Sequence, residues 1–162
     1  MTTMCLAIAD YIINKTNEIN KQREQDRKEK IKMSCKRLQK LIFFCDTEYM
    51  KKHHGKSFTE DKYYAWPNGP VIPEVYLNYM GFQNGEMIPL GEKYKTLSKE
   101  ITKIIDEVID MTAEKSTEEL ITIAHDKNGP WTKHREKQEI IPKREIYSHY
   151  KKTRLKDRLS LN

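Results

Sequence analysis

The sequence predicts a mainly α-helical, single-domain helical bundle with a small two- or three-stranded β element packed against it. Three observations support this fold class. The length of 162 residues suits one hydrophobic core, apolar residues recur at three- and four-residue steps in several segments, and strand-like runs are few and short. No internal repeat or low-complexity linker divides the chain. We therefore expect one helical domain over residues 1–150 and a basic C-terminal tail over residues 151–162.

The first third of the chain predicts two helices joined by a charged segment. Residues 4–19 carry apolar residues near helical spacing. Residues 20–33 form a highly charged insertion, for which a mobile loop and an exposed helical extension are both left open. Ser34 then caps the clearest core helix, and Gly55 follows its last turn.

The middle of the chain carries the β signals. Residues 62–66 are aromatic and precede a turn rich in proline and glycine, so they predict a short strand. Pro73 suits the first position of a helix that ends at Gly81. Apolar residues between 82 and 95, centred on Met87 to Leu90, suggest a second strand that pairs with the first.

Three capping signals organise the remainder. Ser98 opens an amphipathic helix, and Ser116 with Glu119 forms a capping box ahead of the next. Pro142 begins a last helix, which continues through Tyr150.

Composition limits the classes of protein. Hydrophobic residues make up 37% and charged residues 33% of the chain, which indicates a folded protein with a charged surface. No apolar run approaches the roughly 18 to 20 residues of a membrane span, so we expect a cytoplasmic protein without membrane contact. The three cysteines, interpreted as reduced core thiols, are Cys5, Cys35 and Cys45.

The net charge of +6 is concentrated in residues 21–40 and 143–158. Such stretches follow a phosphate backbone, meet an acidic partner, or simply form a solvated surface. The candidate basic patch consists of Lys28, Lys30, Lys32, Lys36 and Arg37. The first stretch lacks interleaved aromatic residues, which weakens the nucleic-acid interpretation.

No motif points to catalysis. The histidines do not stand at metal-site spacing, and the glycines form no phosphate-binding loop. We therefore expect no catalytic residue, no metal and no cofactor. An enzyme assembled from scattered residues such as His125, Glu119 and Asp110 is left open as a third hypothesis.

One segment, residues 63–76, stands out as a candidate binding surface. Its three prolines fix φ, and Gly69 permits a positive φ in the turn. Rigid aromatic loops lose little entropy on binding. The candidate partner-binding residues are Tyr64, Trp66, Asn68, Gly69, Pro70, Val71 and Tyr76. The alternative is that the aromatic residues only lock the strand to the following helix.

Several motifs together resemble the Panacea domain family, also described as Soc-type, phage-associated antitoxins. Residues 38–44 (Leu-Gln-Lys-Leu-Ile-Phe-Phe) are similar to a helix of that family. Residues 65–66 (Ala-Trp), 69–76 (Gly-Pro-Val-Ile-Pro-Glu-Val-Tyr) and 130–131 (Pro-Trp) are similar to its other signatures. The resemblance spans roughly residues 4–150. The insertion at 20–33 and the basic tail depart from the shared pattern.

The resemblance implies an antitoxin that neutralises a toxin encoded next to it, by direct binding or by delivery to a protease, in a bacterium or prophage. A protein partner is therefore expected, and homo-oligomerisation is left open. The runner-up hypothesis is a nucleic-acid-associated phage or regulatory protein that uses its basic stretches.

Overall fold

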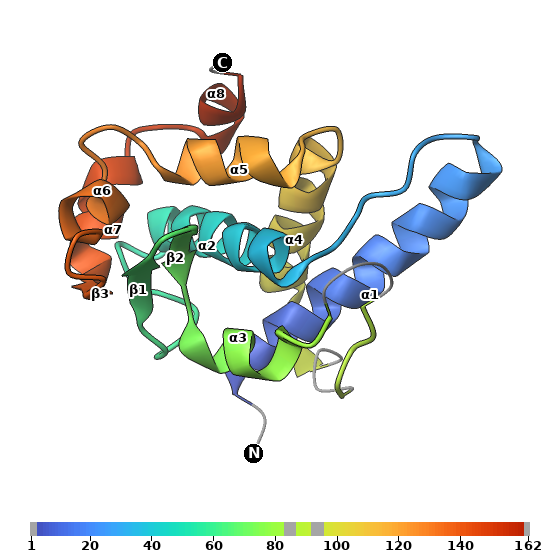
Figure 1. Ribbon diagram of the computed structural model, residues 1–162, viewed down its shortest axis with the longest axis horizontal. Coiled ribbons are helices and arrows are strands. Elements are labelled where there is room, and N and C mark those ends of the chain that lie inside the picture. The colour runs from blue at the N-terminus through green and yellow to red at the C-terminus, as the bar shows by residue number, and fades with distance from the viewer. Residues whose placement is uncertain (1–2, 83–86, 92–95, 161–162) are drawn as a thin grey trace.

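The computed structural model describes residues 3–82, 87–91 and 96–160 (Figure 1). The helices run as α1 Met4–Gln25, α2 Cys35–Lys52, α3 Pro73–Tyr79, α4 Lys99–Thr112, α5 Thr117–Ala124, α6 Pro130–His134, α7 Lys143–Tyr150 and α8 Leu155–Leu159. The strands are β1 Tyr63–Trp66, β2 Gly69–Val71 and β3 Ile140–Ile141. The predicted fold class, mainly α with a small β element, is confirmed.

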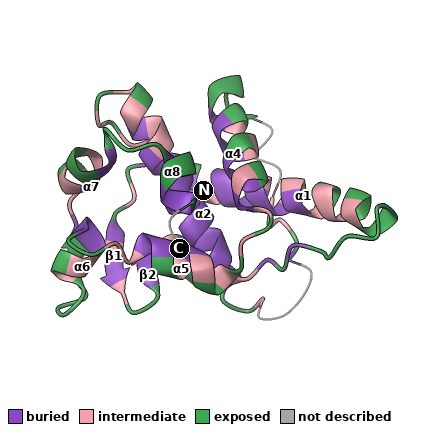
Figure 2. Ribbon diagram, turned by 90° about the horizontal axis from the view of Figure 1, so that it is seen from above, coloured by how far each residue is buried: buried purple, intermediate pink, exposed green. Residues whose placement is uncertain are grey.

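The helix α2 is the centre of the molecule. Ser34 caps it by accepting a hydrogen bond from the Arg37 amide. Its residues from Arg37 to Thr47 are buried without interruption, and it packs against α1, α3, α4, α5, α7 and β2. A helix buried on every side needs a core on every side, and the other helices supply it (Figures 1 and 2).

The sheet has the order β2-β1-β3, with both pairings antiparallel. In the hairpin, Trp66 pairs with Gly69, and on the other edge Tyr63 pairs with Ile141. The strand expected around residues 82–95 is therefore not the partner of β1. Residues 87–91 are not a strand, because the amides of Leu90 and Gly91 donate to the Asp10 carboxylate on α1. Residues 83–86 and 92–95 lie outside the described residues.

The predicted helix starts are confirmed. The hydroxyl of Ser98 accepts the Ile101 amide, and Ser116 and Glu119 make both hydrogen bonds of the capping box. Pro73 occupies the first turn of α3, which ends at Tyr79 rather than at Gly81. Proline suits that position because its missing N–H is one that a helix leaves unpaired there.

The charged segment 20–33 divides between the two alternatives left open by the sequence. The helical extension is correct as far as Gln25, where α1 ends. A turn with positive φ at Arg27 follows, and residues 28–34 run back towards α2 without regular structure. Figure 2 shows the far end of α1 as exposed. Ile31 and Met33 nevertheless bury their side chains in this return segment.

The expected basic tail, residues 151–162, contains the helix α8 and is not free in the described part. Leu155 and Leu159 are buried one turn apart. The guanidinium of Arg158 lies 3.8 Å from the ring centroid of Tyr150. Two leucines at i and i+4 bury an apolar edge that the surrounding charges obscure in the sequence.

All three cysteines are unpaired; Cys5 and Cys45 are buried and Cys35 is partly exposed. None of the helices in the described part of the chain has the length and apolar character needed to span a membrane.

Candidate protein-binding surface

The β1–β2 turn depends on a close approach between its backbone and α2. Gly69 has φ +115°, and a Cβ placed on it would lie 2.6 Å from Cε of Lys40. A positive φ and a contact this short both exclude larger residues. Gly69 therefore lets the hairpin lie directly on the lysine side chain.

Lys40 is fully buried beneath the hairpin. Its Nζ donates a hydrogen bond of 3.3 Å to the carbonyl oxygen of Pro70. Burial lowers the pKa of this ammonium group to about 7, because the charged form loses its hydration. Next to it on α2, the side-chain amide of Gln39 donates to the Ile72 carbonyl and accepts the Ile72 amide, both at 3.0 Å. The helix α2 thus holds the turn by side-chain contacts to its backbone.

A second brace comes from the chain around residues 125–131. Nε1 of Trp131 donates to the carbonyl oxygen of Trp66 at 2.7 Å. The imidazole of His125 stacks on the Trp131 ring at 3.5 Å between centroids. Burial, and then the charge of Lys40, lower the His125 pKa to about 4, so this histidine is a neutral stacking partner.

The seven candidate partner-binding residues separate into two groups. Gly69, Pro70 and Val71 are buried and build the turn, so they offer no side chain to a partner. Those with solvent access are Tyr64, Trp66, Asn68 and Tyr76. The rings of Trp66 and Tyr76 meet edge to face with centroids 5.2 Å apart, so the aromatic pair locks the hairpin to α3 and also faces solvent.

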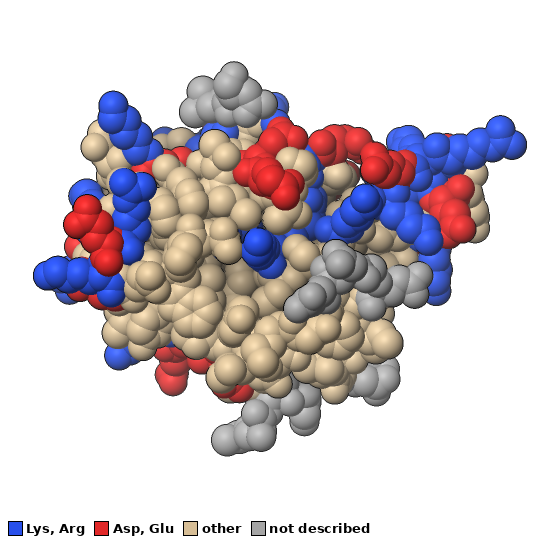
Figure 3. Space-filling view, viewed as in Figure 1, with Lys and Arg blue, Asp and Glu red and all other residues tan. Residues whose placement is uncertain are grey.

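The helix α3 and the residue after it extend this surface with Leu77 and Met80, which the sequence did not single out. Val75 and Tyr79, one turn apart, take the buried side. Tyr76, Leu77 and Met80 are left outside, with exposed fractions of 39%, 65% and 49%. Figure 3 shows a broad area without charge where α3 and the hairpin lie. The sequence of α3 contains four apolar or aromatic residues, which are Val75, Tyr76, Leu77 and Tyr79. A helix of seven residues buries only one side, so two of the four stay exposed.

A groove of about 1250 Å³ adjoins this apolar area. The return segment after α1 and the start of α2 form one wall, the α4–α5 turn forms the other, and the end of α3 contributes Tyr76 and Met80.

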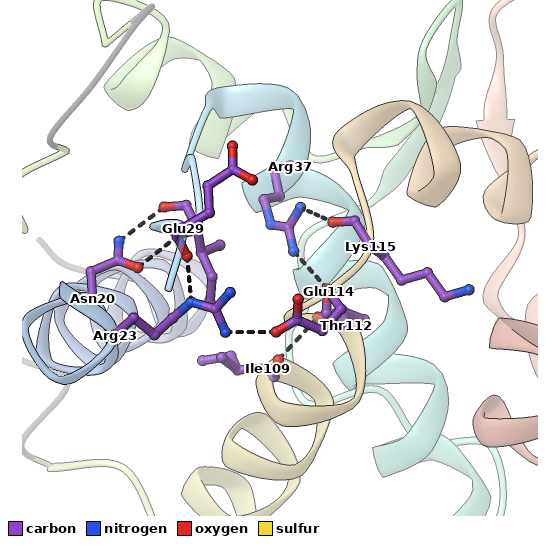
Figure 4. A network of polar contacts seen from close by, with 9 residues as sticks. Asn20, Arg23, Glu29, Arg37, Ile109, Thr112, Glu114 and Lys115 are labelled. Atoms are coloured by element: carbon purple, nitrogen blue, oxygen red, sulfur yellow. Dashed lines mark hydrogen bonds and ion pairs between the residues drawn. The ribbon is translucent and has the colours of Figure 1, made fainter. Parts of the chain in front are cut away.

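The predicted basic patch, apart from Lys28, lines the first wall. Lys28, Lys30, Lys32 and Lys36 are exposed, but Arg37 is only 3% exposed. Its guanidinium donates to the carbonyl oxygens of Lys115 at 2.7 Å and Thr112 at 2.8 Å (Figure 4). Arg37 was wrongly assigned to the patch, because a charged side chain at the first turn of α2 meets the carbonyl end of α4 instead of solvent.

The residues of the enzyme hypothesis have separate surroundings. His125 stacks on Trp131, Glu119 closes the capping box, and Asp110 lies exposed on α4. In the described ranges no hydrogen bond or ion pair joins the three. Nor do the described residues include a group of three or more His, Cys, Asp or Glu side chains fit to hold a metal ion.

The fold and this surface define a helical domain that displays a braced aromatic hairpin beside a charged groove. Residues 38–132 match the family model described as antitoxin SocA-like, Panacea domain. This match covers more than half of the chain, so the protein belongs to the antitoxin SocA-like Panacea domain family. No curated protein and no solved structure matches the chain. The matched residues contain the hairpin, α2 from residue 38 on, α3 to α5 and the start of α6, whereas α1, the charged segment 20–33, α7 and α8 lie outside them.

Proposed function

We propose that this protein is an antitoxin that neutralises a toxin encoded beside its own gene by binding it directly, in the cytoplasm of a bacterium or from a prophage. Membership of the antitoxin SocA-like family carries the proposal. The surface around the hairpin supports it, because it presents aromatic and aliphatic side chains on a backbone that is already fixed.

The physical argument for this surface is its low entropy of ordering. Trp66 is held by the Trp131 hydrogen bond to its carbonyl and by the ring contact with Tyr76. Side chains that are fixed before binding lose little freedom in the complex, and tryptophan and tyrosine are the residues most often found at binding hot spots. Exposed Leu77 and Met80 enlarge the apolar contact area.

The proposed mechanism requires no active site in the antitoxin. Occlusion of the toxin by direct binding is the form we favour. Delivery of the bound toxin to a protease is the alternative form, and it needs the same first step. The two differ in the fate of the toxin, which persists in the first case and disappears in the second.

The test is co-expression of this chain with the neighbouring open reading frame, scored by growth rescue and co-purification. Tyr76→Ala should weaken the complex, with Ile140→Ala as the control, because Ile140 has a similar exposed fraction of 38% on β3. A neighbour that is harmless and unbound would contradict the proposal. Loss of toxin in a protease-proficient strain, with persistence in a deficient one, would identify delivery.

A second candidate function, nucleic-acid binding, rests on the exposed lysines at positions 28, 30, 32 and 36. It predicts binding to duplex or single strands that weakens steeply with salt. The opposite wall of the groove carries Glu114, Glu118 and Glu119, which disfavour a polyanion. Absence of retention on DNA at low salt would remove this candidate.

A further inference from the structure

The walls of the charged groove are joined by hydrogen bonds from side chains on α1. Asn20 on α1 donates to the Ile31 carbonyl at 2.9 Å and accepts the Ile31 amide at 2.7 Å. Nε of Arg23 donates to the Glu29 carbonyl at 2.6 Å, and its Nη1 meets Glu114 across the groove at 2.8 Å (Figure 4). The return segment is therefore held at a set distance from the α4–α5 turn.

The two walls differ in how far their charges are already satisfied. Lys32 and Lys36 are exposed and make no ion pair within the described part of the chain. On the other wall, Glu114 pairs with Arg23, and Glu119 accepts the Ser116 amide and lies 3.8 Å from Lys115. The hydrogen bond from Arg23, and then its charge, hold the pKa of Glu114 below its usual range. Glu118 on the α4–α5 wall and Glu29 on the first wall are also exposed and make no ion pair among the described residues. The unpaired positive charge of the groove is therefore that of Lys32 and Lys36, and it lies on the lysine wall.

Apolar side chains border the same groove at the end of α3. Tyr76 and Met80 line it while remaining about 40 to 50% exposed. A ligand that lies between them and the lysine wall meets apolar surface along one edge and positive charge along the other.

We propose that this groove binds an acidic amphipathic segment of the partner protein. Carboxylates of the segment contact Lys32 and Lys36, and its apolar side chains contact Tyr76 and Met80. The inference deepens the proposed antitoxin function and rests on it for the identity of the partner as a toxin. It also assigns a role to the lysine wall, which lies before the family match begins at residue 38.

A protein segment fits these observations better than a nucleic acid. A phosphate backbone carries a charge at every nucleotide and cannot avoid the glutamate wall, whereas a protein segment places its carboxylates on one edge only. The exposed side chains of Met80 and Leu77 also carry no positive charge or hydrogen-bond donor that could bind a phosphate group.

The first experiment measures the affinity of purified variants for the co-expressed toxin. Lys32→Glu with Lys36→Glu should weaken the complex by about tenfold or more, and Met80→Ser should weaken it similarly. The control Lys127→Glu with Lys137→Glu makes the same charge change at exposed sites away from the groove. Met4→Ser is the control for Met80→Ser, since Met4 is 43% exposed. Circular dichroism checks that all variants remain folded.

The outcomes separate the groove from the proposed function. A toxin complex that both groove variants leave within roughly twofold of the wild type, a change typical of neutral surface substitutions, would overturn the groove proposal and leave the antitoxin function standing. Failure of the wild type to bind or rescue would contradict the antitoxin function alone, and a toxin-independent probe then decides the groove.

That probe is a synthetic amphipathic helical peptide with leucines on one face and glutamates along one edge, compared with the same peptide carrying lysines instead. Nuclear magnetic resonance should show shifts at Lys32, Lys36 and Met80 with the glutamate peptide, and about tenfold weaker binding of the lysine peptide. The double Lys→Glu variant should reverse this preference. Equal binding of both peptides, shifts elsewhere, or tighter binding of a short DNA duplex to the same lysines would overturn the proposal.

Discussion

At the scale of single residues, the contact between Gly69 and Lys40 links the turn to the core. The glycine permits the approach, and the lysine fills the space that a side chain would need. The close packing of the turn on α2 therefore depends on both residues, and each can be substituted separately.

Gly69→Val should destabilise the domain by about 1–3 kcal/mol, because a β-branched residue resists positive φ and its Cβ collides with the lysine stem. Gly81→Val is the control, because a Cβ at that glycine meets nothing within 4 Å. Thermal unfolding followed by circular dichroism measures both. An unchanged melting temperature for Gly69→Val would show that the turn accommodates the side chain.

Lys40 should make stability depend on pH in a distinctive direction. Its folded pKa of about 7 lies below the ordinary value of 10.5, so between these values the unfolded chain binds more protons than the folded chain. Stability then rises with pH across this window, by up to about 1.4 kcal/mol per pH unit. Lys40→Met should remove this rise, as urea unfolding at pH 7, 8 and 9 can show.

The quantity to compare is the slope of the unfolding free energy against pH in the wild type and in Lys40→Met. The absolute stability is less useful, because Lys40→Met also removes the hydrogen bond to the Pro70 carbonyl and so changes the stability at every pH. Buried thiols and phenols such as those of Cys5 and Tyr63 have raised pKa values and reduce stability at higher pH in both proteins. Equal slopes for wild type and variant would contradict a lysine that is neutralised in the fold.

At the scale of elements, Asn20 is one of two α1 side chains that hold the return segment, together with Arg23. Asn20→Ala removes both hydrogen bonds to Ile31 and should increase hydrogen exchange at residues 29–33 while leaving α2 protected. The global free energy of unfolding should fall by only about 1–2 kcal/mol. Asn14→Ala is the control on the same helix, because the side-chain amide of Asn14 donates a hydrogen bond to Glu18 on α1 and not to the return segment.

A protected segment in Asn20→Ala would show that the Arg23 hydrogen bond to Glu29 and the burial of Ile31 and Met33 suffice to hold it. If the groove proposal is correct, the loosened segment should also weaken binding of the acidic peptide, because the lysine wall loses its fixed position.

Elements with strong local signals were predictable from the sequence. Ser34, Ser98 and the Ser116 capping box each marked a helix start that the structure confirms. The strand β3 was not predictable, because two isoleucines become a strand only by pairing with Tyr63 and Tyr64 from far along the chain. The helix α8 was missed because charged residues surround its two leucines.

The candidate site was also predictable only in part, because several of its contacts join segments that are far apart in the sequence. Proline and glycine spacing indicated a rigid turn, and Trp66 and Tyr76 stand beside it as aromatic neighbours. The burial of Arg37 and Lys40 could not be inferred, because each depends on a carbonyl oxygen supplied by a distant element. The groove is likewise formed by three segments that the sequence keeps apart.

At the scale of the whole molecule, α2 is enclosed by elements from both ends of the chain. The family match covers the central part, residues 38–132, and the structure adds α1 at the right of Figure 1, α7 at the left and α8 at the top. These outer helices contribute buried residues such as Ile8, Ile146 and Leu155 to the same core. The core that supports the hairpin therefore extends beyond the family match.

This arrangement predicts that the C-terminal helix stabilises the domain as a whole. Leu155 is 1% exposed, and Arg158 beside it lies over the rings of Phe44 on α2 and Tyr150 on α7. Leu155→Ala should lower the free energy of unfolding by about 2–3 kcal/mol, through lost burial and a residual cavity. Leu77→Ala, at a leucine that is 65% exposed, should change it by less than about 0.5 kcal/mol. Urea unfolding followed by circular dichroism measures both, and equal small effects would mean that α8 does not cover the core in solution.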